Sequence, residues 1–227
     1  MIEDRDMRQR EIIPPEKLAK SPATVIGVGA VGRQVALQLA AIGVPQIQLV
    51  DSDVVEAVNL APQGYFESDL GKFKVDATAH MCRGINSEID VITYASRFRR
   101  SMDHYDCIFM CVDSITDRKF IHQSLDHYRF FCDGRMSSET IRIVYSDPLT
   151  WDRYANTLFD QSEAVQGSCT AKSTIFTANI AAGLMVQQYS RYLRGMPIEE
   201  DMVLNLLSSE LTVVEPEYPS SENSTER

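Results

Sequence analysis

A glycine-rich turn near the N-terminus has the residue types that bind phosphate groups. Gly27, Gly29 and Gly32 form G-V-G-A-V-G between the first apolar run and the first helical pattern. Glycine permits a tight turn and lets phosphate oxygens approach backbone N–H groups at a helix N-terminus. Asp51 ends the second apolar run, where a carboxylate can accept hydrogen bonds from ribose hydroxyls. These residues predict a nucleotide or dinucleotide site.

Further polar side chains follow the later apolar runs. The segment V-D-S-D-V-V-E-A-V-N-L-A-P-Q carries the neutral amides of Asn59 and Gln63. Lys74, in G-K-F-K, puts a point charge suited to a polyphosphate at the start of a predicted helix, and a solvated lysine is the ordinary alternative. Asp113 lies in C-V-D-S, where its carboxylate can either hold Mg²⁺ or cap the helix predicted to begin at Ile115.

These segments resemble the ThiF/MoeB/HesA family of adenylyltransferases, which are similar to ubiquitin-activating enzymes. The family pattern is D-x-D-x-V-x-x-x-N-L-x-R-Q followed by G-x-x-K, and its C-T-D-N segment is similar to C-V-D-S here. The resemblance is strongest over residues 5–135 and weaker through 173–194. It implies an ATP·Mg site made by the glycine turn together with Asp51, Asp53, Asn59, Gln63 and Lys74, and with Asp113 as the Mg²⁺ ligand. A nicotinamide-dependent oxidoreductase would keep the glycine turn but gives no reason for the other motifs.

The N-terminal segment R-D-M-R-Q-R resembles the family's R-x-x-R-Q-I. In the family, the second arginine reaches the ATP site of a neighbouring subunit. By this resemblance Arg8 is a catalytic arginine finger, Arg10 is the second choice, and the protein is a homodimer. A guanidinium there would stabilise charge that develops between the α-phosphate and pyrophosphate. Without the resemblance, arginines near a terminus usually belong to a solvated segment.

Three departures from the family pattern limit these expectations. Pro62 stands where the family has arginine in N-L-x-R-Q, so a phosphate contact is missing. Either Arg10 or another basic residue replaces that contact, or turnover is impaired. No C-x-x-C pair is present, so zinc is not predicted. The chain also lacks room for the separate cysteine domain and ubiquitin-fold domain of the large activating enzymes.

The cysteines divide into one candidate nucleophile and four apolar residues. Cys169 lies in G-S-C-T-A-K-S-T ahead of a long predicted helix, near the place where several family members carry a transfer cysteine. The helix N-terminus and Lys172 would stabilise its thiolate, so it could accept an acyl group or take part in sulfur transfer. The family spacing is not reproduced, so a catalytic role stays open. The core cysteines are Cys82, Cys107, Cys111 and Cys132. The four histidines form no predicted metal cluster.

The activity that the resemblance implies is ATP-dependent adenylation. A carboxylate, already ionised near neutral pH, attacks the α-phosphate of ATP and pyrophosphate leaves. In the family this carboxylate is usually the C-terminal glycine of a ubiquitin-like or sulfur-carrier protein, which is therefore the expected partner. The alternatives are a peptide, a tRNA-linked carboxylate or a small metabolite as substrate, or a non-catalytic subunit that retains the fold.

Strand-forming apolar runs alternate with helical patterns along the first two thirds of the chain. The predicted strands are 24–29, 47–52, 90–96, 106–113 and 130–134, and the predicted helices are 31–42, 71–85 and 115–128. This alternation predicts an α/β, Rossmann-like, doubly wound and mostly parallel sheet with helices on both faces. Ligands bind at the carboxyl ends of such strands.

The last third of the chain is less regular. We expect an additional, antiparallel strand at 140–147, a flexible loop at 148–168, a long helix at 173–194 and a short helix at 199–208. The domains expected are an N-terminal arm at 1–20, an ATP-binding adenylation domain at 21–212 and a disordered tail at 213–227.

Composition favours one cytoplasmic domain. The chain has 227 residues, 44% of them hydrophobic, enough for one core. A formal net charge of -10 argues against nucleic-acid binding, which needs a basic face. The apolar runs are too short for a membrane span and the charged N-terminus has no signal-peptide core, so no membrane partner is expected.

Overall fold

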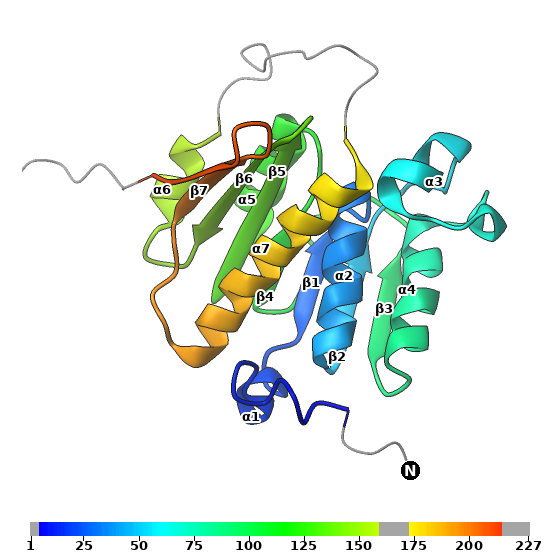
Figure 1. Ribbon diagram of the computed structural model, residues 1–227, viewed down its shortest axis with the longest axis horizontal. Helices are drawn as coiled ribbons and strands as arrows, with labels where there is room; N and C mark the ends of the chain where they lie inside the picture. The colour runs from blue at the N-terminus through cyan, green and yellow to red at the C-terminus, as the bar shows by residue number, and fades with distance from the viewer. Residues whose placement is uncertain (1–4, 159–172, 215–227) are drawn as a thin grey trace, which may run out of the picture.

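One eight-stranded sheet runs through the molecule, in the order β3-β2-β1-β4-β5-β6-β7-β8 (Figure 1). The computed structural model describes residues 5–158 and 173–214. The first five strands in chain order are parallel, and they are β1 Ala23–Ile26, β2 Gln46–Val50, β3 Asp90–Tyr94, β4 Cys107–Met110 and β5 Phe130–Ser137. The predicted mostly parallel α/β sheet is confirmed.

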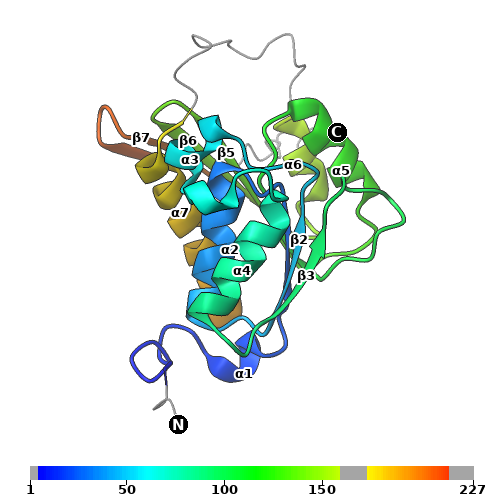
Figure 2. The ribbon, with the colours of Figure 1, turned by 90° about the vertical axis from the view of Figure 1, so that its right-hand side faces the viewer.

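Helices cover both faces of this sheet (Figure 2). One face carries α2 Ala30–Ile42, α4 Lys74–Ile85 and α7 Ile175–Arg194, and the other carries α5 Ile115–Ser124 and α6 Trp151–Asn156. Two separate apolar clusters fill the two layers, one with Val35 and Met185, the other with Ile121 and Tyr154. Since α2 packs between α4 and α7, most of its small residues are buried and its helix axis is held firmly against the sheet.

The C-terminal third differs from the sequence prediction in two places. The predicted antiparallel strand is confirmed as β6 Thr140–Ser146. The predicted loop contains α6, and the remainder at 159–172 lies outside the described residues. The short helix predicted at 199–208 was wrong, because that segment forms a hairpin of β7 Asp201–Asn205 and β8 Glu210–Val213.

Pairing with β6 explains the hairpin. The apolar residues of M-V-L-N-L-L fit both a helical and an alternating pattern, so their periodicity does not decide between helix and strand. In the fold, β7 pairs antiparallel with β6, and the Arg142 guanidinium lies 2.6 Å from the Asp201 carboxylate across that pairing. The Asn205 side chain then accepts hydrogen bonds from Leu207 and Ser208 N–H groups and closes the turn.

Within residues 5–20, side chains bind the C-terminal end of α2. This segment includes the short helix α1 Pro15–Leu18, and Ile13 joins the main apolar cluster. Arg5 and Gln9 donate to the carbonyl oxygens of Ala41 and Ile42, each at 3.1 Å. These bonds satisfy carbonyl groups that a helix C-terminus leaves without partners. Of the helices in residues 5–158 and 173–214, none is long and apolar enough to cross a membrane.

Candidate functional site

The glycine turn lies at the topological switch point of the sheet. Strand β1 pairs with β2 on one side and with β4 on the other, so the chain leaves in opposite directions from the carboxyl ends of β1 and β4. Ligands bind in the crevice that such a divergence opens. The turn after β1 leads directly into α2, whose first backbone N–H groups have no side-chain cap. This end of α2 therefore offers donors to an anion.

The three glycines of the turn differ in the space around their α-carbons. Gly27 has φ +86°, and a β-carbon there would lie 2.8 Å from the backbone carbonyl of Cys111. A β-carbon on Gly32 would lie 1.8 Å from the Gly27 oxygen. At Gly29 it would meet no described atom within 4 Å. Gly27 and Gly32 thus allow β1, β4 and α2 to pack closely, whereas Gly29 faces open space where a phosphate can approach.

Asp51 joins the glycine turn to the loop after β2. Its carboxylate accepts a 2.6 Å hydrogen bond from Val28 N–H and a 2.8 Å bond from Asp53 N–H. Burial raises the pKa of this carboxyl, against the opposing effect of those two backbone bonds and of Lys74. Each carboxylate oxygen has a second lone pair, so Asp51 can hold the loops in register and still accept a ribose hydroxyl.

A cavity of ≈ 410 Å³ lies beyond the carboxyl end of β2. It is lined by Ser52, Asp53, Val54, Glu56, Asn59 and Lys74. Lys74 opens α4, its side chain is 7% exposed, and its Nζ lies 2.9 Å from Asp53 Oδ2. A solvated lysine is therefore not what the structure shows. The structure brings together three of the predicted ligands, Asp53, Asn59 and Lys74, around one cavity.

The short helix α3 Ala57–Gln63 forms one wall of this region. Asn59 accepts a 2.9 Å hydrogen bond from Glu56 N–H through its Oδ1, so its NH₂ end is the part that remains for a ligand. The buried Oε1 of Gln63 has no hydrogen-bond partner among the described residues, and Gln63 does not line the cavity. Pro62 lies inside α3, and its ring offers no donor where the family pattern has arginine.

Asp113 follows β4 on the other side of the switch point. Its side chain is exposed, and the described residues place no hydrogen-bond donor on its carboxylate. The helix α5 is capped instead by Ser114, whose hydroxyl accepts from Asp117 N–H. The capping alternative for Asp113 was therefore wrong, and its carboxylate is available for a cation.

A buried charge cluster that the sequence analysis missed lies beside Asp113. The Asp133 carboxylate accepts from Arg118 Nε at 2.9 Å, from Arg135 Nε at 2.6 Å and from the Tyr154 hydroxyl at 3.0 Å. Burial opposes the charge of Asp133, but the two guanidinium groups outweigh it and lower the pKa of this carboxyl. Arg118 also donates to the Asp113 carbonyl, at 3.3 Å. The cluster therefore fixes the backbone that presents Asp113.

The signal for this cluster in the sequence was weak. Arg118 lies on a helix, whereas Asp133 and Arg135 lie on β5 with one residue between them. Only the acid and base of C-D-G-R therefore indicated an ion pair. Arg135 also binds Thr157 through its backbone oxygen at 2.8 Å and its hydroxyl at 2.7 Å. Thr157 leads into residues 159–172, which include Cys169.

The remaining predicted residues lie elsewhere. Arg8 and Arg10 belong to the N-terminal segment at the C-terminal end of α2. The 13 residues of α2 span about 20 Å, so Arg8 cannot reach the glycine turn of its own subunit. Cys169 and Lys172 lie outside the described residues. Of the predicted core cysteines, Cys82, Cys107 and Cys132 are buried and Cys111 is half-buried.

The residues at the switch point fit an ATP·Mg complex. The open space at Gly29 admits a phosphate close to the N-terminus of α2. Lys74 supplies a positive charge in the cavity beyond β2, and Asp113 supplies an exposed carboxylate after β4. Mg²⁺ typically takes one or two carboxylates together with phosphate oxygens and water, which matches this donor set.

Comparison with known proteins found a family model and curated relatives that match the chain. Residues 5–221 match the model of the ThiF family. The chain is 39% identical over 110 residues to the adenylyltransferase and sulfurtransferase MOCS3 of Arabidopsis thaliana, a match over 46% of this chain and 24% of that protein. It is 34% identical over 125 residues to the MOCS3 of Bos taurus, over 49% of this chain and 28% of that protein. The matches thus span about a quarter of the length of these curated relatives.

Solved structures share the fold at lower identity. MccB of E. coli with ATP has a TM-score of 0.73 at 17% identity, over 92% of this chain and 70% of that chain. MccB with AMPCPP and MccA gives the same TM-score and identity, over 93% and 71%. A crystal structure of PaaA has a TM-score of 0.69 at 20% identity, over 87% and 73%.

Proposed function

The chain belongs to the ThiF family, and from that premise we propose that it adenylates a carboxylate with ATP·Mg. The substrate that the family favours is the C-terminal glycine of a ubiquitin-like or sulfur-carrier protein. One observation carries the proposal: the glycine turn after β1, the Lys74–Asp53 pair after β2 and the exposed Asp113 after β4 follow three neighbouring parallel strands, at whose carboxyl ends the switch-point crevice opens. A dinucleotide oxidoreductase needs the turn but has no use for a buried lysine in that crevice.

The residues have separate parts in the reaction. The N-terminus of α2 and Lys74 hold the phosphates, Asp51 holds the ribose, and Asp113 holds Mg²⁺. The carboxylate oxygen of the substrate attacks the α-phosphorus, and the bond to pyrophosphate breaks, so pyrophosphate leaves with the electron pair. No general base is needed, since the attacking carboxylate is ionised near neutral pH. Catalysis then rests on positioning and on neutralising the leaving charge.

Asp53 keeps Lys74 in place for that task. A lysine with a 7% exposed side chain loses most of its hydration, and the carboxylate at 2.9 Å compensates for this loss. The Asp53 side chain is 62% exposed, so solvent and ligand phosphates reach the same pair. Lys74 can therefore exchange part of its contact with Asp53 for a phosphate oxygen without moving its backbone.

A homodimer would complete the site. Arg8 lies at the far end of α2 from the glycine turn of its own subunit, so it can act only on the site of a second copy. An arginine supplied in this way would offset the donor missing at Pro62. The interaction is a proposal that rests on the R-D-M-R-Q-R motif and on this placement.

The substrate class has a second candidate. The curated relatives are named as adenylyltransferases and sulfurtransferases, which supports a sulfur-carrier protein. The MccB structures contain MccA and cover more of this chain, which supports a peptide carboxylate.

Thioester formation at Cys169 after adenylation is a further proposed step. Trapping of acylated protein that hydroxylamine cleaves would detect this step, and the signal should vanish in Cys169→Ala.

Calorimetry of ATP·Mg and of NAD tests the proposal. ATP·Mg should bind the wild type, and Asp113→Ala should weaken binding and abolish pyrophosphate exchange driven by a carboxylate substrate. Glu88→Gln is a matched control, because Glu88 is an exposed carboxylate just before β3. It therefore lies at the amino ends of the strands, away from the glycine turn. Binding of NAD alone would overturn adenylation. Equal ATP binding by wild type and Asp113→Ala, without exchange, would identify a non-catalytic subunit.

A further inference from the structure

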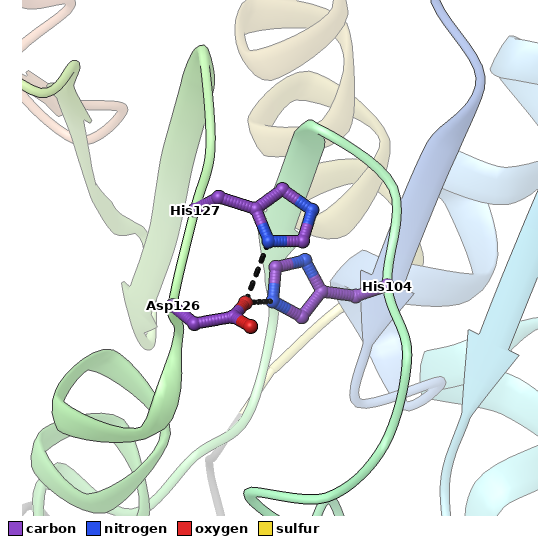
Figure 3. A group of neighbouring side chains, drawn as sticks. All are labelled: His104, Asp126 and His127. Atoms are coloured by element: carbon purple, nitrogen blue, oxygen red, sulfur yellow. Dashed lines mark hydrogen bonds and ion pairs between the residues drawn. The ribbon is translucent and has the colours of Figure 1, made fainter.

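Two loops at the amino ends of β4 and β5 bring two histidines and an aspartate together (Figure 3). His104 precedes β4, and Asp126 and His127 precede β5. The expectation that the histidines form no metal-ligand cluster was therefore wrong for this pair. The site lies at the amino ends of the strands and the glycine turn lies at their carboxyl ends, so the site is separate from the candidate nucleotide site.

One carboxylate oxygen faces both imidazole rings. Asp126 Oδ1 lies 3.0 Å from His104 Nε2 and 2.6 Å from His127 Nδ1 (Figure 3). The His104 side chain is 2% exposed, whereas those of Asp126 and His127 are 80% and 54% exposed. The cluster thus has one buried, fixed member and two members at the surface that solvent ions can reach.

The His104 ring directs one nitrogen to the backbone and the other to Asp126. Its Nδ1 lies 3.2 Å from the Tyr105 carbonyl oxygen, which can only accept, so Nδ1–H donates to that oxygen and Nε2 is the ring atom left for a ligand. Its buried Nε2 has no hydrogen-bond partner among the described residues and faces the Asp126 oxygen. A cation beside this nitrogen and the carboxylate oxygen, which lie 3.0 Å apart, would be attracted to both.

We propose that His104, Asp126 and His127 bind a divalent transition-metal ion of the zinc type. The ligand atoms are His104 Nε2, His127 Nδ1 and an Asp126 carboxylate oxygen, which all lie within 4.8 Å of one another. Imidazole nitrogen and carboxylate oxygen are zinc ligands, and water completes a tetrahedral set. The bond from His104 Nδ1–H to a backbone carbonyl is the outer contact that orients a metal-binding histidine.

Binding requires one ring to turn. The two imidazole rings stack with centroids 4.4 Å apart and an interplanar angle of 20°. Nearly parallel stacked rings do not aim their in-plane lone pairs at one point, so the exposed His127 ring rotates while the buried His104 ring stays in place. Nearby, Asp106 lies 3.5 Å from His127 Nε2 and 3.0 Å from Arg129 Nε. Because Arg129 is paired with the Asp106 carboxylate, its positive charge repels an incoming cation less.

Cobalt titration of the metal-stripped, tag-free full chain tests the site. Co²⁺ should bind with one equivalent per subunit and give visible d–d bands, without a thiolate charge-transfer band, and Zn²⁺ should displace it. Asp126→Asn and His127→Gln change exposed residues and should keep the fold, yet weaken binding at least about 100-fold, since even loss of an outer contact costs about 10–100-fold. His80→Gln, at an exposed histidine on α4, is the matched control.

Two results would overturn the proposal. One is the absence of Co²⁺ and Zn²⁺ binding to the wild type at micromolar protein, which would mean that a proton alone joins Asp126 to the rings. The other is binding that Asp126→Asn, His127→Gln and His104→Gln leave unchanged, or that shows a thiolate band, which would assign the ion to cysteines. ATP affinity, measured on the same variants, should stay as in the wild type.

Discussion

The carbonyl oxygen of Gly27 lies only 1.8 Å from the place where a β-carbon on Gly32 would have to be. The first turn of α2 therefore rests directly on the backbone of the glycine turn. This contact holds the helix N-terminus at the carboxyl end of β1, where a phosphate would bind. It explains why packing requires glycine at position 32. At position 29 a β-carbon would meet no described atom, so glycine there serves the approach of a ligand.

Substitution of these glycines should separate folding from nucleotide binding. Gly32→Ala forces the turn and α2 apart, and we expect a loss of about 3 kcal/mol or more in the free energy of unfolding. Gly29→Ala adds a methyl group to open space, so stability should change little while ATP affinity falls. Urea unfolding and calorimetry of both variants check this. A Gly32→Ala protein as stable as the wild type would contradict the packing argument.

Lys74 should matter for adenylation far more than its neighbour Lys72. Loss of one preorganised charge contact typically slows a reaction about 10²–10³-fold, and we expect that range for Lys74→Gln. Lys72→Gln is the control, because Lys72 has a 54% exposed side chain and pairs with Asp69 at 3.2 Å, away from the cavity. Pyrophosphate exchange rates measure the effect. Equal exchange rates for the two variants would show that Lys74 takes no part in adenylation.

The buried cluster at Asp133 should dominate the stability of the β5 end of the sheet. Asp133→Asn leaves Arg118 and Arg135 buried without a counter-charge, so we expect a loss of about 3–5 kcal/mol. Asp201→Asn breaks the Arg142 pair, which is partly exposed, and should cost no more than about 1 kcal/mol. Denaturant midpoints of the two variants give the comparison. Similar losses of unfolding free energy in the two variants would show that the buried Asp133 network stabilises the fold no more than the partly exposed pair does.

His122 should make the fold sensitive to acid. Burial against Trp151 lowers the pKa of His122 to about 4, from an ordinary 6.5. The unfolded chain then binds a proton between these pH values and the folded chain does not, so stability falls as pH drops from about 6.5 towards 4. After allowance for solvent screening, we expect about 1–2 kcal/mol from this residue.

The variant His122→Phe isolates this effect. It keeps the ring that stacks on Trp151 but cannot be protonated, so its free energy of unfolding should decline less between pH 6.5 and 4.5 than that of the wild type. The difference between the two proteins cancels the titration of the other groups. Parallel pH profiles would mean that His122 titrates normally.

Mixing two inactive variants tests whether Arg8 acts on a second subunit. Arg8→Ala and Asp113→Ala damage the same site from different chains if the site is shared. Random exchange of subunits should then restore roughly a quarter of wild-type activity, since half of the dimers carry one intact site. Arg5→Ala is the control, because Arg5 binds the carbonyl end of α2. No recovery after verified exchange would exclude a shared site.

Local signals in the sequence determined the fold class and named most residues of the proposed nucleotide site. Alternating apolar runs and helical patterns predicted the parallel sheet, because period and length distinguish strands from amphipathic helices over these segments. The glycine turn, Asp51 and Lys74 were predicted because each lies at the end of a predicted strand or near the start of a predicted helix, whereas Asp53, Asn59 and Gln63 followed from the resemblance to the ThiF family. In a parallel sheet such positions converge on one edge.

Only the tertiary structure decided the features made by segments far apart in the chain. The pattern at 199–208 suited helix and strand alike, and pairing with β6 selected the strand. Arg118, Asp133 and Tyr154 lie on three different elements, so their network had no local signature. His104 and His127 likewise meet only because β4 and β5 are adjacent and parallel, which places the loops before them side by side.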